Sequence, residues 1–213
     1  MSRKTDPRVK RTRKMFENAL LELMEEKDYQ KITVQELTKR AALNRATFYL
    51  HFYDKNELLE QCLDEALEDL KKSVKIPDFE FNYHHDQPHP AFIRLFEKIM
   101  ENRDFYKIML AEAKIPYFTE EVAKVIEQFV EQGLSFLEKD KIQLLIPSNI
   151  VKSYITSAYL GVIIWWLKSD MPYTPQYMAK QLTIMSTVGQ FVDNPYLKEA
   201  GADKKRVSMN AIF

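Results

Sequence analysis

Residues 32–59 read ITVQELTKRAALNRATFYLHFYDKNELL. Thr33 and Glu36 stand three residues apart and predict a capping box at the start of a short helix. Asn44 predicts the N-cap of a second short helix, and Asp54 that of a third. Two short helices across a tight turn are typical of the helix-turn-helix motif, whose second helix enters the major groove of DNA.

The side chains of the second helix add a chemical argument to the spacing. Leu43, Phe48 and Phe52 can point inward, which leaves several donors on other faces without a core role: Thr47, Tyr49, His51 and Lys55. Each of these can donate to phosphate oxygens. Arg45, near the helix start, is the residue type found most often in bidentate contact with guanine. Periodicity alone is also compatible with a helix pair in an all-α protein of another function.

Residues 41–59, AALNRATFYLHFYDKNELL, carry a family resemblance. They resemble the DNA-binding domain of the tetracycline-repressor (TetR) family of bacterial transcription regulators, whose pattern runs roughly Ala-Gly-Val-Ser-Lys-Gly-Thr-Leu-Tyr-x-His/Tyr-Phe-x-Ser/Asp-Lys-Glu-x-Leu-Leu. Ala42 replaces the usual turn glycine, and Ala46 replaces a frequent glycine on the recognition helix. The resemblance covers about residues 7–70, and beyond them the chain is similar to the family in architecture more than in motif.

The resemblance implies a role for each residue of the motif. Base readout is expected from Arg45 and Ala46, with Asn44 beside them. Phosphate contacts are expected from Thr33, Thr47, Tyr49, His51 and Lys55. Two simpler interpretations remain open, in which Tyr49 is a half-buried tyrosine that braces the domain and His51 is an ordinary surface histidine.

The N-terminus concentrates positive charge. Residues 1–14 contain seven Lys and Arg against Asp6 alone, a local net charge of +6, whereas the whole chain has 31 basic and 31 acidic residues. A basic arm beside a helix-turn-helix fits attraction to phosphates, although basic tails are also common as solvated segments. Asp6 followed by Pro7 predicts the start of a first helix.

Composition limits the remaining classes. Four glycines in 213 residues and a predominance of helix formers predict an all-α fold of about nine helices. The single cysteine, Cys62, suits a reducing cytoplasm. The basic N-terminus leads into an amphipathic helix and does not resemble a signal peptide, and the apolar stretch 155–167 is too short for a membrane span. No catalytic motif emerges, so we expect neither an enzyme nor a cofactor.

The chain divides into two expected domains. Residues 1–56 are expected to form the DNA-binding domain, a helix over 55–73 to link the domains, and residues 57–213 to form a regulatory and dimerisation domain. After an irregular connection at 75–90, helical patterns are predicted at 90–102, 104–113, from a Thr119 cap, 149–168 and 174–192.

The last two predicted helices are apolar around most of their circumference, which favours burial on more than one side. In a protein that binds a two-fold symmetric operator this indicates a homodimer interface, and the resemblance implies that paired C-terminal helices of two subunits form a four-helix bundle. The alternative is a central core helix in a monomer. The expected interface residues are Tyr159, Ile163, Trp166, Met178, Leu182 and Met185.

The same half is expected to hold any effector pocket, apolar and fixed by tyrosine hydroxyls. Candidate lining residues are Met100, Tyr106, Met109, Phe129, Phe136, Tyr154 and Trp165. His84, His85 and His89 could in principle bind a transition metal, but their spacing matches no standard site, so no metal is expected.

The sequence therefore predicts a cytoplasmic, homodimeric regulator that binds a pseudo-palindromic DNA operator, acts as a repressor and is released by a small apolar effector, without membrane contact. The alternative is a regulator-like co-activator controlled by a protein partner, because the C-terminal half resembles a branch of the family in which such behaviour is known. A plain helical interaction or metal-binding protein is the third class.

Overall fold

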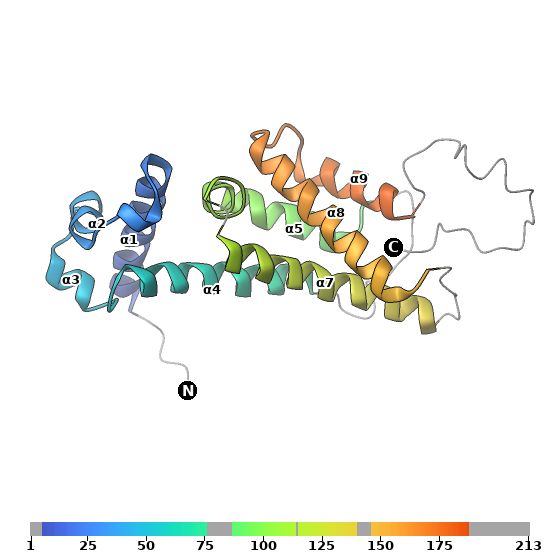
Figure 1. Cartoon of the computed structure of the whole chain (residues 1–213), viewed down its shortest axis with the longest axis horizontal. Coiled ribbons are helices and arrows are strands. Elements are labelled where there is room, and N and C mark those ends of the chain that lie inside the picture. Colours follow the sequence, from blue (N-terminus) through green and yellow to red (C-terminus); the bar gives the residue numbers. More distant parts are fainter. Residues whose placement is uncertain (1–5, 76–86, 114, 140–145, 188–213) are drawn as a thin grey trace, which may run out of the picture.

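The computed structural model describes residues 6–75, 87–113, 115–139 and 146–187, and every regular element within these ranges is helical. Figure 1 shows α1, α2 and α3 together at one end, the long α4 leading away from them, and α5, α7, α8 and α9 grouped at the other end. The predicted all-α architecture, an N-terminal helix-turn-helix followed by a C-terminal helical domain, is confirmed.

The four predicted N-terminal helices occur in the predicted order, and a short 3₁₀ turn that was not predicted lies between the first two. In chain order the elements are α1 (Pro7–Glu26), the 3₁₀ turn η1 (Tyr29–Lys31), α2 (Val34–Arg40), α3 (Arg45–Tyr49) and α4 (Lys55–Val74). The side chain of Asp6 accepts a hydrogen bond from the Arg8 N–H at 2.8 Å, with Pro7 at the first helical position. Asp54 caps α4 in the same way, because its side chain accepts from the first-turn N–H groups. The predicted caps at both helices are confirmed.

Three phenylalanines hold the recognition helix α3 onto α1. Phe16 and Phe48 are fully buried, and their rings meet edge to face with centroids 5.2 Å apart. Phe52, immediately beyond α3, meets Phe16 at 6.0 Å in the same geometry. Edge-to-face contacts add to the large apolar area that these rings bury. The motif is therefore a small rigid body and not two loosely joined helices.

The turn between α2 and α3 depends on a left-handed residue. Ala42, where the family pattern has glycine, adopts φ 53°. This conformation costs a residue with a Cβ roughly 1–2 kcal/mol, whereas glycine adopts it without this cost. The departure from the family pattern therefore carries a local strain.

We expect Ala42→Gly to raise the free energy of unfolding by about 1 kcal/mol, because it removes the Cβ that clashes at positive φ. This corresponds to roughly 2–4 °C in melting temperature for a chain of this size, measured by circular dichroism. Ala66→Gly, in the interior of α4, is the matched control and is expected to destabilise by about 1 kcal/mol. Equal signs for the two substitutions would contradict the argument.

The C-terminal elements follow the prediction with adjusted boundaries. They are α5 (Pro90–Glu101), α6 (Arg103–Tyr106), the π-helical segment η3 (Lys107–Glu112), α7 (Pro116–Lys139), α8 (Ser148–Lys168) and α9 (Pro175–Thr187). The single helix predicted at 104–113 is two segments of different pitch. Helix α7 begins at Pro116, three residues before the predicted Thr119 cap, and the Thr119 hydroxyl instead donates to the Ile115 carbonyl.

Helix α8 is longer than the apolar stretch 155–167 that the sequence prediction considered. Its 21 residues are long and apolar enough to cross a membrane, judged by length and composition alone. In the structure its inner face packs against α7 and η3 and buries Tyr159, Ile163 and Trp166. A core helix of a helical domain passes the same test of length and composition. The prediction of too short a segment applies to residues 155–167 alone and not to the whole of α8.

Candidate nucleic-acid interface

The N-cap of α3 fixes how the helix presents its side chains. The Asn44 Oδ1 accepts hydrogen bonds from the Thr47 backbone N–H at 2.7 Å and from the Thr47 hydroxyl at 2.9 Å. The carbonyl oxygen of the Asn44 amide is therefore used, and its NH₂ group remains as a donor. Because the Thr47 hydroxyl donates its hydrogen bond to Asn44, it can donate to a phosphate, as predicted, only if the bond to Asn44 breaks.

Arg45 and Tyr49 form a pair on the exposed side of α3. The Arg45 guanidinium lies 5.5 Å from the centre of the Tyr49 ring, and its Nη2 donates to the Tyr49 hydroxyl at 3.2 Å. The Tyr49 ring also meets the buried Phe48 edge to face at 5.5 Å, while Tyr49 is 48% exposed. The ring of Tyr49 thus packs against the core, as the bracing interpretation predicts. Its partial exposure is also compatible with the predicted phosphate contact. Ala46 lies exposed between them.

Thr33 caps α2 through the predicted capping box. Its backbone N–H and its hydroxyl both donate to the Glu36 carboxylate, at 3.0 and 2.9 Å, and the Lys27 ammonium pairs with the same carboxylate. These hydrogen bonds, first from Lys27 and then from Thr33, lower the pKa of Glu36 to about 2. The network joins the end of α1 to the start of α2.

This network should make the motif sensitive to acid. Because the pKa of Glu36 is lowered in the folded state, its stabilising effect is fully present above the usual pKa of about 4.5 and is lost as the pH falls towards 2. We expect Glu36→Gln to flatten the fall in melting temperature between about pH 4.5 and pH 2. Glu60→Gln, on the exposed surface of α4, is the control and should leave the wild-type pH profile unchanged.

Lys55 does not extend toward solvent as the resemblance implied. Its Nζ donates to three backbone carbonyls, those of Tyr29, Gln30 and Ile32, at 3.0, 3.0 and 2.8 Å. It also lies 4.7 Å from the centre of the Tyr29 ring. An ammonium has only three N–H donors, so Lys55 ties the start of α4 to the turn after α1 and is not positioned as a phosphate contact. The sequence could not reveal this, because the acceptors are backbone groups of another segment.

Two exposed side chains beside α3 were not among the predicted contacts. Leu50 is 81% exposed and Tyr53 is 85% exposed. The sequence could have indicated these two exposed residues, because both are large and neither belongs to the residues predicted to point inward, Leu43, Phe48 and Phe52. His51, between them, is partly buried with its ring centroid 6.2 Å from that of Phe52.

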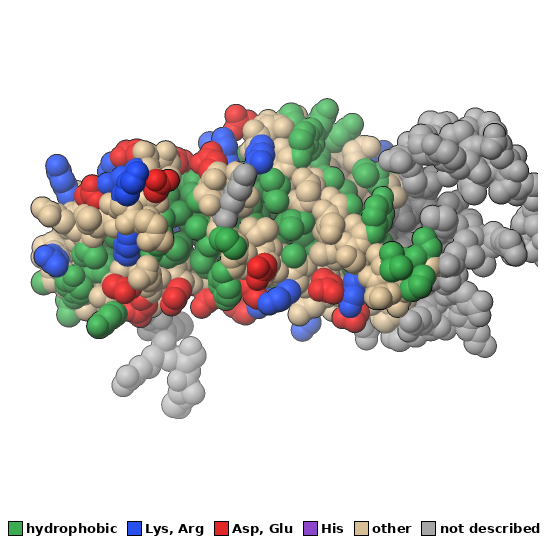
Figure 2. Space-filling view, viewed as in Figure 1, with side chains coloured by type: hydrophobic (Ala, Val, Ile, Leu, Met, Phe, Trp, Pro, Cys, Tyr) green, Lys and Arg blue, Asp and Glu red, His purple; other side chains and the backbone are tan. Residues whose placement is uncertain are grey.

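Basic side chains accompany this surface. Arg8, Lys10 and Arg11 are exposed on the first turns of α1, and the Arg13 guanidinium lies 5.6 Å from the Phe52 ring centre. Figure 2 shows Lys and Arg side chains projecting at the end of the molecule that carries α2 and α3. The Arg3 and Lys4 of the predicted arm lie outside the described residues.

The structure does not bring the predicted effector-pocket residues into one cavity. Tyr106 and Met109 are buried near α4 and α8, and the Tyr106 hydroxyl donates to the Ala66 carbonyl at 3.3 Å. Phe129 lines a separate apolar cavity of about 10 Å³. Tyr154 and Trp165 are 73% and 48% exposed on α8. Met100 is partly buried at the end of α5, and the side chain of Phe136 lies outside the described residues.

The predicted dimer-interface residues mostly face the interior of a single chain. Five of the six, all except Met185, are at most 5% exposed: Tyr159, Ile163, Trp166, Met178 and Leu182. They pack among α5, α7, α8 and α9; Trp166, for example, meets Phe96 at 5.1 Å. Assigning them to a dimer interface was therefore wrong. The exposed apolar residues of these helices form the opposite face and include Ile150, Tyr154, Trp165, Tyr177 and Met185.

The histidine cluster contributes no site to the described chain. His84 and His85 lie outside the described residues. His89 is the N-cap of α5, and its Nδ1 accepts from the Ala91 N–H at 3.2 Å. Among the residues that the structure does describe, no group of three or more His, Cys, Asp or Glu is arranged to hold a metal ion.

Two sequence profiles match the chain. One, described as bacterial regulatory proteins of the tetR family, matches residues 18–62, and the other, described as a transcriptional regulator C-terminal region, matches residues 86–187. The first match contains the whole helix-turn-helix, and the second contains α5 to α9.

Individual relatives agree with these profiles. The Bacillus subtilis (strain 168) HTH-type transcriptional regulators YxbF and YuxN are 23% identical over 177 residues and 29% identical over 132 residues. The alignments cover 83% and 60% of this chain but 44% of each relative, so the chain spans less than half the length of these relatives. The crystal structure of a TetR transcriptional regulator from Streptococcus agalactiae 2603V superimposes with a TM-score of 0.60 at 25% identity, covering 84% of this chain and 96% of that chain.

Proposed function

Because the chain belongs to the tetR family of bacterial transcriptional regulators, we propose that it is a homodimeric repressor that binds a pseudo-palindromic DNA operator and is released by a small effector. The observation that carries the DNA-binding part is the exposed side of α3. There Arg45, Ala46 and the amide of Asn44 project from a helix that Phe48 fixes in the core.

The geometry of α3 supports a division between base and phosphate contacts. Arg45 carries the planar donor pair that matches the O6 and N7 acceptors of guanine, and the Tyr49 ring beside it restricts its orientation. The methyl group of Ala46 can contact a thymine methyl group. The Tyr49 hydroxyl, His51 and the basic first turns of α1 are suited to phosphates, which position the helix without reading sequence.

The proposed dimer uses the outward face of α8 and α9. Ile150, Tyr154, Gly161 and Trp165 are spaced by four, seven and four residues, which places them on one face of α8, and all are exposed in the chain as described, as is Met185 on α9. Several large exposed apolar residues on one helix face are typical of an interaction site. To bind a pseudo-palindromic operator, such a dimer must hold its two copies of α3 in successive major grooves, about 34–36 Å apart or a multiple of that distance.

Release of the operator is proposed to act through α4. This helix begins at the Asp54 cap beside the motif and contacts α5 and α7 in the C-terminal half. A shift of α5 or α7 would therefore be transmitted along α4 to the motif. An effector that favours one orientation of α4 would change the separation of the two recognition helices. Operator-bound and effector-bound dimers with the same separation would refute this step.

The decisive experiment is selection of bound fragments from genomic DNA, followed by affinity measurements on the recovered site. We expect a pseudo-palindromic site and an affinity that falls steeply with salt, by a slope of about 0.9 per phosphate contacted on logarithmic axes. Arg45→Ala is expected to cost roughly 5- to 100-fold in affinity and to relax the preference at one base pair. Lys124→Ala, which removes one positive charge from α7, is the control, and an equal loss in both variants would contradict base readout by Arg45.

A regulator controlled by a protein partner is the second candidate. The apolar cavity at Phe129, between α5, α7 and α8, measures about 10 Å³, and a second cavity that Phe129 lines, between α4 and α7, measures about 220 Å³. Pockets for drug-sized ligands usually measure roughly 300–1,000 Å³. Co-purification of a defined protein that changes operator affinity, in the absence of any effect of small molecules, would favour this candidate.

A further inference from the structure

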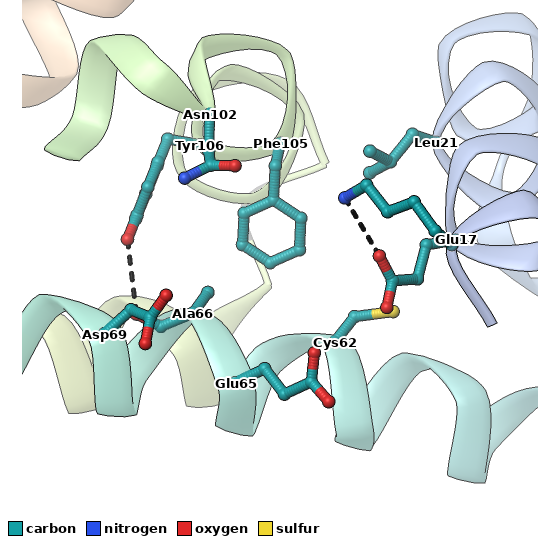
Figure 3. A pocket seen from close by; sticks show the side chains of 10 residues that line it. Glu17, Leu21, Cys62, Glu65, Ala66, Asp69, Asn102, Phe105 and Tyr106 are labelled. Atoms are coloured by element: carbon teal, nitrogen blue, oxygen red, sulfur yellow. Dashed lines mark hydrogen bonds and ion pairs between the residues drawn. The ribbon is translucent and has the colours of Figure 1, made fainter. Parts of the chain in front are cut away.

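A cleft at the junction of the two halves is separate from the recognition surface and lies at the edge of the apolar core. It has a volume of about 160 Å³ and lies where α1, α4 and α6 meet. Figure 3 shows the Glu17 and Leu21 side chains of α1 on one side, Cys62, Glu65 and Asp69 of α4 on another, and Asn102, Phe105 and Tyr106 on the third. Any molecule held there would touch both the DNA-binding part and the regulatory part.

The charged groups around the cleft are predominantly acidic. Glu17, Glu65 and Asp69 contribute three carboxylates against the single ammonium of Lys14, which pairs with Glu17 at 2.9 Å. Asp69 has a weak exposed partner in Lys72 at 3.7 Å. Glu65 makes no side-chain hydrogen bond or ion pair within the described part of the chain. The lining therefore carries a net charge of −2 and favours a cationic guest.

The carboxylates are close enough to act on the groups inside. Burial raises the pKa of the Cys62 thiol, and the negative charges of Glu17 and Glu65 raise it further. Burial and then the charge of Asp69 likewise raise the pKa of the Tyr106 hydroxyl. All three carboxylates thus contribute to a negative potential around these two groups, and the Lys14 ammonium offsets part of it at Cys62.

Apart from the Asn102 amide, the remaining lining is apolar or aromatic. The Phe105 ring lies between α1 and α4 in Figure 3, and it is held edge to face by Tyr106 at 5.6 Å and by Phe118 at 5.5 Å. Leu21 and Ala66 complete this side. A cavity of roughly 150 Å³ lined by apolar groups can hold one benzene ring, so the volume fits a single ring, and an aromatic face also attracts a cation.

We propose that this junction cleft is a binding site for a small organic cation, an amine joined to one apolar or aromatic group. The ammonium would pair with Glu65 and Asp69 on α4, and the apolar group would lie against Phe105, Leu21 and Ala66. A carboxylate that accepts from an ammonium makes a charge-assisted hydrogen bond, which gives selectivity over a neutral molecule of the same shape.

The site has a regulatory consequence that rests on the proposed function. Because the guest contacts α1 and α4 together, it stabilises one relative orientation of the motif and the C-terminal helices. Binding of the cation and binding of operator DNA are then coupled, and coupling between sites is typically about 5-fold or more in affinity.

The test uses the full chain and calorimetric titration with 2-phenylethylamine, with 2-phenylethanol as the neutral isostere. We expect the amine to bind with a Kd on the order of 0.1–1 mM and the alcohol to bind at least about tenfold more weakly. The double variant Glu65→Gln with Asp69→Asn is expected to weaken amine binding by about tenfold or more. The matched control is Glu60→Gln with Asp64→Asn on the exposed surface of the same helix, which should bind the amine as the wild type does.

Three results would overturn the proposal: no binding of the amine up to about 10 mM, equal binding of amine and alcohol, or equal affinity in the lining and control variants. None of these measurements requires DNA, so they are independent of whether the chain binds an operator. The regulatory consequence is tested separately, by measuring operator affinity with and without saturating amine in the wild type and in the lining variant. If the amine leaves operator affinity unchanged, the coupling is refuted, while the proposed binding site is not.

Discussion

Gly161→Arg is expected to convert the proposed homodimer to a monomer and to lower operator affinity by about 100-fold or more, because one half-site is then held without the second. Gly161 lies on the outward face of α8, near Ala158 and Trp165 along the helix. A Cβ built at this position meets no described atom within 4 Å. The substitution therefore leaves the single chain intact, and replacing glycine within a helix even favours the fold. In the dimer, by contrast, it places a long cation in an apolar interface.

The dimer prediction is checked by analytical ultracentrifugation together with operator titration. Gln128→Arg, on the exposed surface of α7, makes the same change in charge and should remain dimeric with unchanged operator affinity. Circular dichroism should report the same helix content for both variants. A dimeric Gly161→Arg protein would exclude this face of α8 as the interface.

Phe48→Ala is expected to lower the free energy of unfolding by about 3–5 kcal/mol and to abolish DNA binding. Phe48 is fully buried, and it contacts the rings of Phe16, Tyr49 and Phe52. Removing it leaves a cavity at the point where α3 is attached to α1, and α3, with only five residues, has few other contacts to compensate. The residue that orients Arg45 would lose its support at the same time, because Tyr49 packs on Phe48.

Urea denaturation measures the effect, and Leu50→Ala provides the matched control. Leu50 is only two residues away but 81% exposed, so its truncation should change stability by about 0.5 kcal/mol or less. We expect most of the helical signal to persist in Phe48→Ala, because α5, α7, α8 and α9 pack on one another. Similar stability losses in the two variants would show that burial does not decide the stability of this motif.

The helix-turn-helix could be predicted from the sequence because its signals are local. The Thr33–Glu36 box, the Asn44 cap and the Asp54 cap all involve groups within three residues of each other, and each is formed. The boundaries of α7 and of the α6–η3 region were harder to predict. Helix α7 packs against α4 and α8, and η3 packs against α8, and such long-range contacts are not encoded in the local signal from Thr119.

The roles of individual side chains depended on partners that are distant in sequence. Lys55 has the spacing of a phosphate contact, but the carbonyl groups of Tyr29, Gln30 and Ile32 use all its donors. Helices α8 and α9 are apolar on several faces, so periodicity could not separate the inward face from the outward one. Tyr159 and Trp166 point inward because α5 and α7 cover that side, and Tyr154 and Trp165 are left outside.

The sequence alone determined the all-α class, the order of the helices, the caps of the motif and the exposed position of Arg45, because these follow from short-range hydrogen bonds and from amphipathic spacing. Only the tertiary structure decided which apolar face remains for a partner, that Lys55 is committed internally, and that three helices enclose an acidic cleft beside Phe105. These features arise where segments far apart in the chain meet, and the free energy of such contacts depends on their three-dimensional complementarity, which no local pattern records.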